Sequence, residues 1–252
     1  MEKKKRHLWL SWLVAILLVG ATVGTYVYVH HLESIKEVKI TKQKKIDEKN
    51  EKINKKLIKK QKKNMTKPIS WDQPSETLPY PDIKKYKNYK TYNRVWLSVD
   101  LKAERLYVHQ GPYTIYTMYA YANRDYDEMS DNQRTPTGIF KIHKNRGTDY
   151  YDAPKGYFYH AWLSFGKHGN SMIQSVPTTE NGGKIKKITD VLGKRYKHKH
   201  VVKTNGAIWL SAPDAKWLVE NIPAKTIIII QSQKEKTDPY QTLKKYYEQK
   251  KD

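Results

Sequence analysis

The stretch that decides the fold is "TNGAIWLSAPDAKWLVENIPAKTIIII", Thr204–Ile230. It predicts a turn, a short strand, a capped helix and a final buried strand. Ser211 is a good helix N-cap, Pro213 fits the first turn, and Asp214 suits the positive end of the helix dipole. The helix has one apolar face, made of Ala215, Leu218, Val219 and Ile222. This face predicts that the helix packs on a sheet.

Alternating apolar and polar residues precede this stretch from Arg94 onward. The segments "RVWLSVD" and "ERLYVHQ" predict two strands joined by a tight turn at 101–103. "YTIYTMYAYAN" predicts a third, long strand of the same meander, and "TPTGIFKIH", "YFYHAWLSF" and "SMIQSVP" predict three more. The sequence therefore predicts a mostly β domain over residues 94–231, either a β-sandwich or a mixed sheet, with one packed helix.

The N-terminus has the pattern of a membrane anchor. Four basic residues at positions 3–6 precede an uncharged run, Leu8–Val29, which would span about 33 Å as a helix. This predicts a cytoplasmic basic tip (1–7), a transmembrane signal-anchor (8–29), and a single-pass topology with the C-terminal domain in the cell-wall space. The alternative is a cleavable signal peptide with a small-residue site near Gly20 and Ala21.

Between the anchor and the domain lie two segments of different composition. Residues 30–67 are rich in lysine and contain no glycine or proline, which predicts a helical stalk. Ile46, Ile53 and Leu57 are compatible with a weak coiled-coil seam, and a solvated spacer is the other interpretation. Residues 68–93 are rich in proline and tyrosine, so they form either an extended segment laid on the domain or a linker. Residues 232–252 read as a charged tail.

Composition restricts both chemistry and partners. The 252-residue chain has a net charge of +23, which favours polyanions: nucleic acid, anionic lipid or acidic wall polymers. If the domain lies outside the cytoplasm, the remaining polyanionic partners are the cytoplasmic membrane and the wall polymers. Nucleic acid is then not expected as a partner. The cysteine count is zero, which excludes disulfides, thiolate nucleophiles and cysteine metal sites.

With these elements placed, the chain resembles the YkuD family, the L,D-transpeptidase catalytic domain that crosslinks bacterial peptidoglycan through a cysteine. "RTPTGIF" is similar to the family's "TPxGxF" turn, "QSVP" to "HSVP", and "NRGTDYY" to the "RG" loop of many Gram-positive members. Leu192 and Gly193 match the "LG" before the nucleophile. "NGAIWLSAPDAKWLVENIPAKT" resembles "HGCxRLSxPDAxWLxxNIPxGT". The resemblance covers Val95–Ile230 and implies a YkuD-like fold.

The sequence departs from the family pattern at the positions where the family has its catalytic residues. Ala207 stands where the family has its nucleophilic cysteine, Gln174 replaces the upstream histidine, and Asn205 replaces the histidine before the glycine. Trp209 replaces an arginine. A methyl group has no lone pair with which to form an acyl-enzyme, and an amide is not a useful base. The resemblance therefore implies a transpeptidase fold that has lost transpeptidase activity.

Four other residues are candidates to replace the missing catalytic groups. Ser211 and Thr204 carry hydroxyls, but neither has an identifiable base nearby in the sequence. His198 and His200 are two residues apart in a basic segment that contains no acidic ligand, so no metal and no other cofactor is expected.

The residues that would bind a ligand without reacting with it are the remaining candidates for a functional site. We expect Trp209, Asn205, Gln174 and Gly206 to contact a ligand, with His198 and Lys199 on a basic lid beside them. Packing of Trp209 within the domain is the competing interpretation. The sequence thus predicts a membrane-anchored pseudoenzyme that binds peptidoglycan and anionic wall polymers or modulates active wall enzymes. The alternatives are an active L,D-transpeptidase with an unrecognised nucleophile, and a structurally inert domain on a charged spacer.

Overall fold

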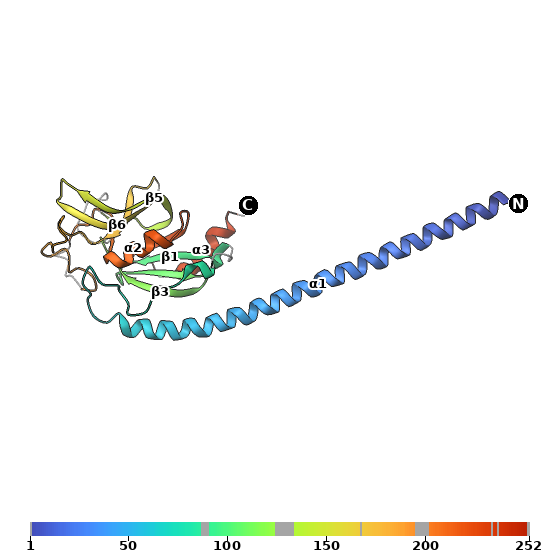
Figure 1. The fold of residues 1–252 in the computed structure, drawn as a ribbon, viewed down its shortest axis with the longest axis horizontal. Coiled ribbons are helices and arrows are strands. Elements are labelled where there is room, and N and C mark those ends of the chain that lie inside the picture. Colours follow the sequence, from blue (N-terminus) through green and yellow to red (C-terminus); the bar gives the residue numbers. More distant parts are fainter. Residues whose placement is uncertain are drawn as a thin grey trace. The chain divides into compact units, whose positions relative to one another are not determined.

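The computed structural model describes residues 2–250 except 87–90, 124–133, 167, 195–201, 233 and 236. The chain forms two compact units, Met1–Ile53 and Asn54–Asp252. Helix α1 (Glu2–Asn64) forms the first unit and ends within the second (Figure 1). The predicted helix through the lysine-rich segment is therefore present.

The first unit exposes its apolar side chains. Within the described residues, Ala15–Ile46 is long and apolar enough to cross a membrane, with a mean hydropathy of 1.4 and no part buried. A membrane anchor and a signal sequence both satisfy this criterion.

The second unit is built mainly from β-strands. In its described part, nine strands form one sheet in the order β3-β2-β1-β9-β5-β6-β7-β8-β4. Their bounds are β1 Val95–Asp100, β2 Arg105–Gln110, β3 Tyr113–Tyr119, β4 Tyr121–Ala122, β5 Gly138–Asp152, β6 Tyr157–Phe165, β7 Ser171–Ser175, β8 Ile208–Leu210 and β9 Ile227–Gln231. The β1–β9 and β7–β8 pairs are parallel and the other pairs are antiparallel. The predicted mixed sheet is confirmed.

Strands β3 and β4, at the two edges of the sheet, are separated in the chain by a single residue, Ala120. The sequence predicted one strand through "YTIYTMYAYAN", but that strand breaks at Ala120. The Ala120 amide still donates to the Glu104 carbonyl (3.0 Å), whereas the next residue, Tyr121, pairs with Trp209 on β8. Consecutive Cα atoms are about 3.8 Å apart, so β3 and β4 bring opposite edges of the sheet together. The sheet must therefore curl.

Helix α2 (Ala212–Asn221) lies inside this curl, between β1–β3 and β5–β6 (Figure 1). Ser211 caps it as predicted, accepting from the Asp214 amide at 3.4 Å. The predicted apolar face is also confirmed, because Ala215, Leu218 and Ile222 are buried in the main core with residues from both halves of the sheet. One hydrophobic core therefore packs α2 against both halves of the sheet.

Two segments differ from the prediction. The "NRGTDYY" segment does not form a loop, because it continues β5, whose residues Arg146–Asp152 pair with β6. Residues beyond 232 are not only a charged tail, because they include helix α3 (Pro239–Glu248), capped by Asp238. Leu243 of α3 is buried against Trp96 and Ile229. The helix covers the face of β9 that is opposite the main core.

A segment that we call the strap, residues 65–86, lies on the surface of the domain. Two backbone–backbone hydrogen bonds of its described residues join it to the domain: the Ile69 amide donates to the Leu192 carbonyl (3.4 Å), and the Trp71 carbonyl accepts from the Ala212 amide (2.7 Å). Tyr80 stacks on Trp217 of α2 with 5.4 Å between ring centroids. The strap ends in the short helix η1 (Ile83–Tyr86), and the turn η2 (Thr91–Asn93) precedes β1.

Candidate functional site

The turn before β8 has an unusual backbone. Asn205 and Gly206 both adopt positive φ, 52° and 79°, and the Ala207 amide donates to the Thr204 carbonyl at 3.2 Å. Asparagine tolerates this left-handed region better than most residues, and glycine adopts it at little steric cost. The turn exposes Asn205 and buries Gly206, so only the asparagine side chain is open to solvent.

The four altered family positions lie together. The pairing of β7 with β8 places Gln174 beside Trp209, and β4 places Tyr121 on the other side of Trp209. Gln174, Asn205, Ala207 and Trp209 all line one cavity of about 250 Å³. The structure therefore brings these four predicted residues into one site. His198 and Lys199 lie outside the described residues, and Gly206 is not part of the cavity lining.

The hydroxyls nearest in sequence to Ala207 already have other partners. Thr204 is buried, and its hydroxyl donates to Asn123 Oδ1 (2.9 Å), which also accepts from the Thr204 amide (2.6 Å). Ser211 is buried as the N-cap of α2. The described lining of the cavity contains no histidine. Neither hydroxyl is therefore positioned with a base for covalent catalysis.

Histidine and carboxylate groups occur in a neighbouring cavity. His160 of β6 lines it together with Asp72 and Asp149. Burial lowers the pKa of His160, so the ring is neutral near pH 7. Within the described ranges, no three histidine, aspartate or glutamate side chains are grouped so that they could hold a metal ion.

Trp209 forms the floor of the 250 Å³ cavity rather than an open platform. It is only 2% exposed and belongs to a second hydrophobic cluster with Ala207, Tyr121 and Leu192. Ile208 and Leu210 belong to the main core on the other side of β8. The indole N–H of Trp209 is buried and has no hydrogen-bond partner in the described part of the chain. The side chain therefore both lines the cavity and supports the domain.

An aromatic wall borders the same cavity. It comes from the hairpin of β5 and β6, where Tyr150 pairs with Tyr159 and Asp152 with Tyr157. The Tyr150 and Tyr159 rings are stacked, 6.1 Å apart and inclined by 17°. At the turn, Lys155 forms an ion pair with Asp152 at 2.6 Å. All five residues line the cavity, together with Lys203 and Asn205.

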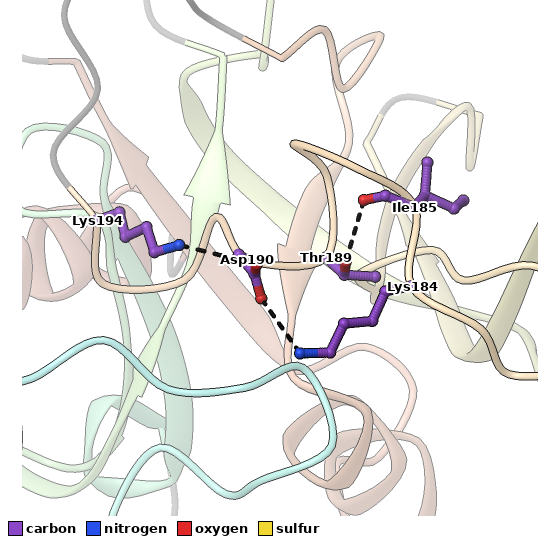
Figure 2. Close-up of polar contacts among 5 residues, drawn as sticks. All are labelled: Lys184, Ile185, Thr189, Asp190 and Lys194. Atoms are coloured by element: carbon purple, nitrogen blue, oxygen red, sulfur yellow. Dashed lines mark hydrogen bonds and ion pairs between the residues drawn. The ribbon is translucent and has the colours of Figure 1, made fainter.

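The loop before the site packs behind Trp209. Figure 2 shows the Asp190 carboxylate between Lys184 and Lys194, at 4.0 and 3.9 Å, and the Thr189 hydroxyl donating to the Ile185 carbonyl. The three charged side chains are exposed, and such ion pairs contribute little to stability. The loop is held mainly by its apolar residues, because Ile188, Val191 and Leu192 belong to the same cluster as Trp209.

Gly193, the second residue of the "LG" motif, allows the strap to approach this loop. Its φ is +76°, and a Cβ atom there would lie 2.9 Å from the Cα of Pro68 and 2.9 Å from the Tyr119 ring. No other residue type fits this position without moving the strap. The motif thus has a packing role that the sequence alone did not reveal.

Asp214 joins the strap to α2, a role that the sequence analysis missed. It is fully buried and accepts hydrogen bonds from the Ser75 amide (3.2 Å), the Ser75 hydroxyl (2.5 Å) and the Tyr80 hydroxyl (2.7 Å). Glu76, also buried, accepts from the Thr117 amide at 3.0 Å. Neither contact could be predicted, because the partners are separated by 139 and 41 residues.

Burial changes the protonation of both acids. Desolvation raises the pKa of Asp214 to about 6 and that of Glu76 to about 7, and repulsion by Asp214 adds to the rise at Glu76. Both pKa values are higher in the folded state, so the folded state binds protons more tightly than the unfolded state. This contribution to stability is fully present below about pH 4.5, the ordinary value for Glu76, and is lost as pH rises through about 7.

We therefore predict that Glu76→Gln removes part of the pH dependence of stability. Relative to this variant, the wild-type free energy of unfolding should fall by about 2 to 3 kcal/mol between pH 4.5 and pH 8, because glutamine stays uncharged. The measurement is urea denaturation of the full-length protein in detergent at several pH values. Parallel pH profiles for the two proteins would contradict the assignment.

Comparison with known proteins places the chain in a family. It is 35% identical over 164 residues to the protein named "Putative L,D-transpeptidase YciB" of Bacillus subtilis (strain 168), covering 64% of this chain and 74% of that protein. Among solved structures, the L,D-transpeptidase (Yku) of Stackebrandtia nassauensis is 15% identical with a TM-score of 0.40, covering 60% of this chain. The L,D-transpeptidase of Mycobacterium smegmatis is 17% identical with a TM-score of 0.39, covering 55% of this chain.

This chain spans 62% and 58% of those two crystallised chains. No protein-family model matches the sequence. The identity with the Bacillus subtilis protein, which this chain covers over nearly three quarters of its length, decides the assignment. The chain belongs to the L,D-transpeptidase family, and it is a member without the catalytic cysteine.

Proposed function

We propose that this protein is a catalytically inactive L,D-transpeptidase homologue that binds peptidoglycan in the space outside the cytoplasmic membrane. One observation carries the proposal: Ala207, Gln174 and Asn205, which the motif resemblance aligns with the family's cysteine and histidines, line the same cavity. The cavity therefore keeps a shape in which a wall fragment could sit, while the groups that would react with it are absent.

The side chains that remain are suited to binding. Asn205, Gln174 and Asn170 offer amide donors and acceptors, and the tyrosines of the hairpin offer apolar surface with polar tips. A pocket with aromatic walls and a few convergent polar groups is typical of small-molecule sites. The binding of active wall enzymes would be an additional role of the same domain.

Helix α1, at the N-terminal end of the chain, supports the proposed location. The span within α1 would hold the protein in the cytoplasmic membrane, with basic residues 3–6 inside and the second unit outside. The lysine-rich part of α1 would then lie in the anionic matrix of the wall. With a net charge of +23, long-range attraction to acidic wall polymers would concentrate the protein there.

We predict that the full-length protein, kept soluble in detergent, sediments with purified sacculi in a salt-dependent way. Most of the binding should be lost between 0.1 M and 1 M salt, because the screening length falls from about 10 Å to about 3 Å. A residual fraction should persist at high salt and on sacculi stripped of anionic polymers, since the cavity recognises the peptidoglycan itself. The absence of binding to native sacculi at low salt would contradict the proposal.

A further inference from the structure

The hairpin of β5 and β6 divides its aromatic residues between two faces. Strand pairing places Tyr150 opposite Tyr159, and Tyr151 opposite Phe158. Successive side chains of a strand point to opposite faces, so Tyr150 and Tyr151 face opposite ways. Tyr150 lines the 250 Å³ cavity and Tyr151 does not, although the two residues are almost equally exposed, at 45% and 43%.

The cavity face of the hairpin holds an exposed ring in a fixed position. Tyr159 is buried and stacks on Tyr150, and Tyr157 meets the Tyr159 ring edge-on at 6.5 Å and 80°. Burial raises the pKa of Tyr159, so its phenol stays neutral. Tyr150 is thus supported from one side by a rigid neighbour while nearly half of its surface stays open.

The polar groups around this ring are mostly uncharged. The rest of the lining presents the amides of Asn205, Asn170 and Gln174 and the ammonium group of Lys203, and the Asp152 carboxylate is paired with Lys155. A pyranose ring has an apolar face of C–H groups surrounded by hydroxyls, so it matches an aromatic ring that is flanked by amide donors and acceptors. An N-acetyl substituent adds one amide that pairs with the same side chains.

The size of the cavity favours a single ring. Its volume of about 250 Å³ is below the roughly 300–1,000 Å³ of pockets that enclose drug-sized ligands. One sugar ring with its substituent is therefore closer to this volume than a four-residue peptide.

We propose that this cavity binds the saccharide part of the wall polymer, an N-acetylated hexosamine ring stacked on Tyr150. The inference rests on the proposed function and specifies its ligand as sugar rather than stem peptide. In a family member whose reactive groups are replaced, the site then recognises the glycan strand. The tyrosine wall, and not the buried Trp209, provides the stacking surface.

The test is titration calorimetry with the full-length protein in detergent, at about 1 M salt to suppress binding by the lysine-rich segment. The probes are a tetramer of N-acetylglucosamine and, separately, the free stem tetrapeptide. Wild type should bind the tetramer and not the peptide. Tyr150→Ala should weaken the affinity about tenfold, and Tyr150→Phe, which keeps the ring, by less than about threefold.

Tyr151→Ala is the matched control, because it removes an equally exposed ring from the opposite face of the same hairpin. It should leave the affinity within about twofold of wild type. Equal losses in Tyr150→Ala and Tyr151→Ala would overturn the proposal, as would binding of the peptide in place of the tetramer. Sacculus binding without tetramer binding would overturn the sugar assignment alone, and loss of both would overturn the proposed function too.

Discussion

Replacing Asp214 by alanine should lower the free energy of unfolding of the second unit by about 3 to 5 kcal/mol. Asp214 is fully buried and accepts from the Ser75 amide, the Ser75 hydroxyl and the Tyr80 hydroxyl. Without the carboxylate, these donors stay buried without acceptors, and each costs its desolvation free energy. The strap would also lose one of its attachments to α2. Urea denaturation of the full-length protein in detergent, followed by tryptophan fluorescence, measures the loss.

Asp238→Ala is the matched control, because Asp238 is likewise an acidic residue at the N-terminal end of a helix. It is the exposed N-cap of α3, accepting from the Tyr240 amide at 3.0 Å. Loss of such a cap typically costs about 1 kcal/mol. If Asp214→Ala lost no more stability than Asp238→Ala, the role of Asp214 as the anchor of the strap would be wrong.

Trp209→Ala should cost a similar amount, about 3 to 5 kcal/mol, since it removes a large ring from a packed cluster. The ring lies 6.1 Å from that of Tyr121 and is buried beside Ala207 and Leu192. Trp209→Phe should lose less than half as much, because an aromatic ring remains and the unpartnered indole N–H is removed. An alanine variant within about 1 kcal/mol of wild type in urea denaturation would show that the cluster does not depend on this ring.

This expectation also affects how ligand binding is tested. A Trp209→Ala variant that no longer binds a wall fragment would not separate a lost contact from a deformed cavity. Tyr150 is a cleaner probe, because it lies on the exposed hairpin and contributes little to the core.

Most of the fold could be predicted from local patterns. The alternation in 94–110 predicted β1 and β2, and Ser211 with Pro213 predicted the start of α2. The break at Ala120 could not be predicted, because every residue around it suits a strand and the break depends on the distant strand β8. Helix α3 was missed among charged residues, although Asp238 and Pro239 form a recognisable helix start.

The residues of the site could be predicted where the sequence follows the family motifs, and not elsewhere. The four altered positions were found from the motifs, and the structure brings them together. The tyrosine wall had a local signal, because "DAPKG" at 152–156 is a turn sequence, with Gly156 at φ 66° in the structure. Its position beside the cavity depends on the pairing of β6 with β7, which no local pattern reveals.

We propose that the cavity has kept a binding shape and lost its reactive groups. Intact-mass spectrometry measures this loss of reactivity. The full-length protein in detergent, as wild type and as Ala207→Cys, is incubated with disaccharide-tetrapeptide beside a cysteine-containing family enzyme. We predict no covalent adduct and no crosslinked dimer with wild type, and no crosslinking with Ala207→Cys, whose thiol would still lack a histidine base. A stoichiometric acyl adduct on the wild-type protein would contradict the account.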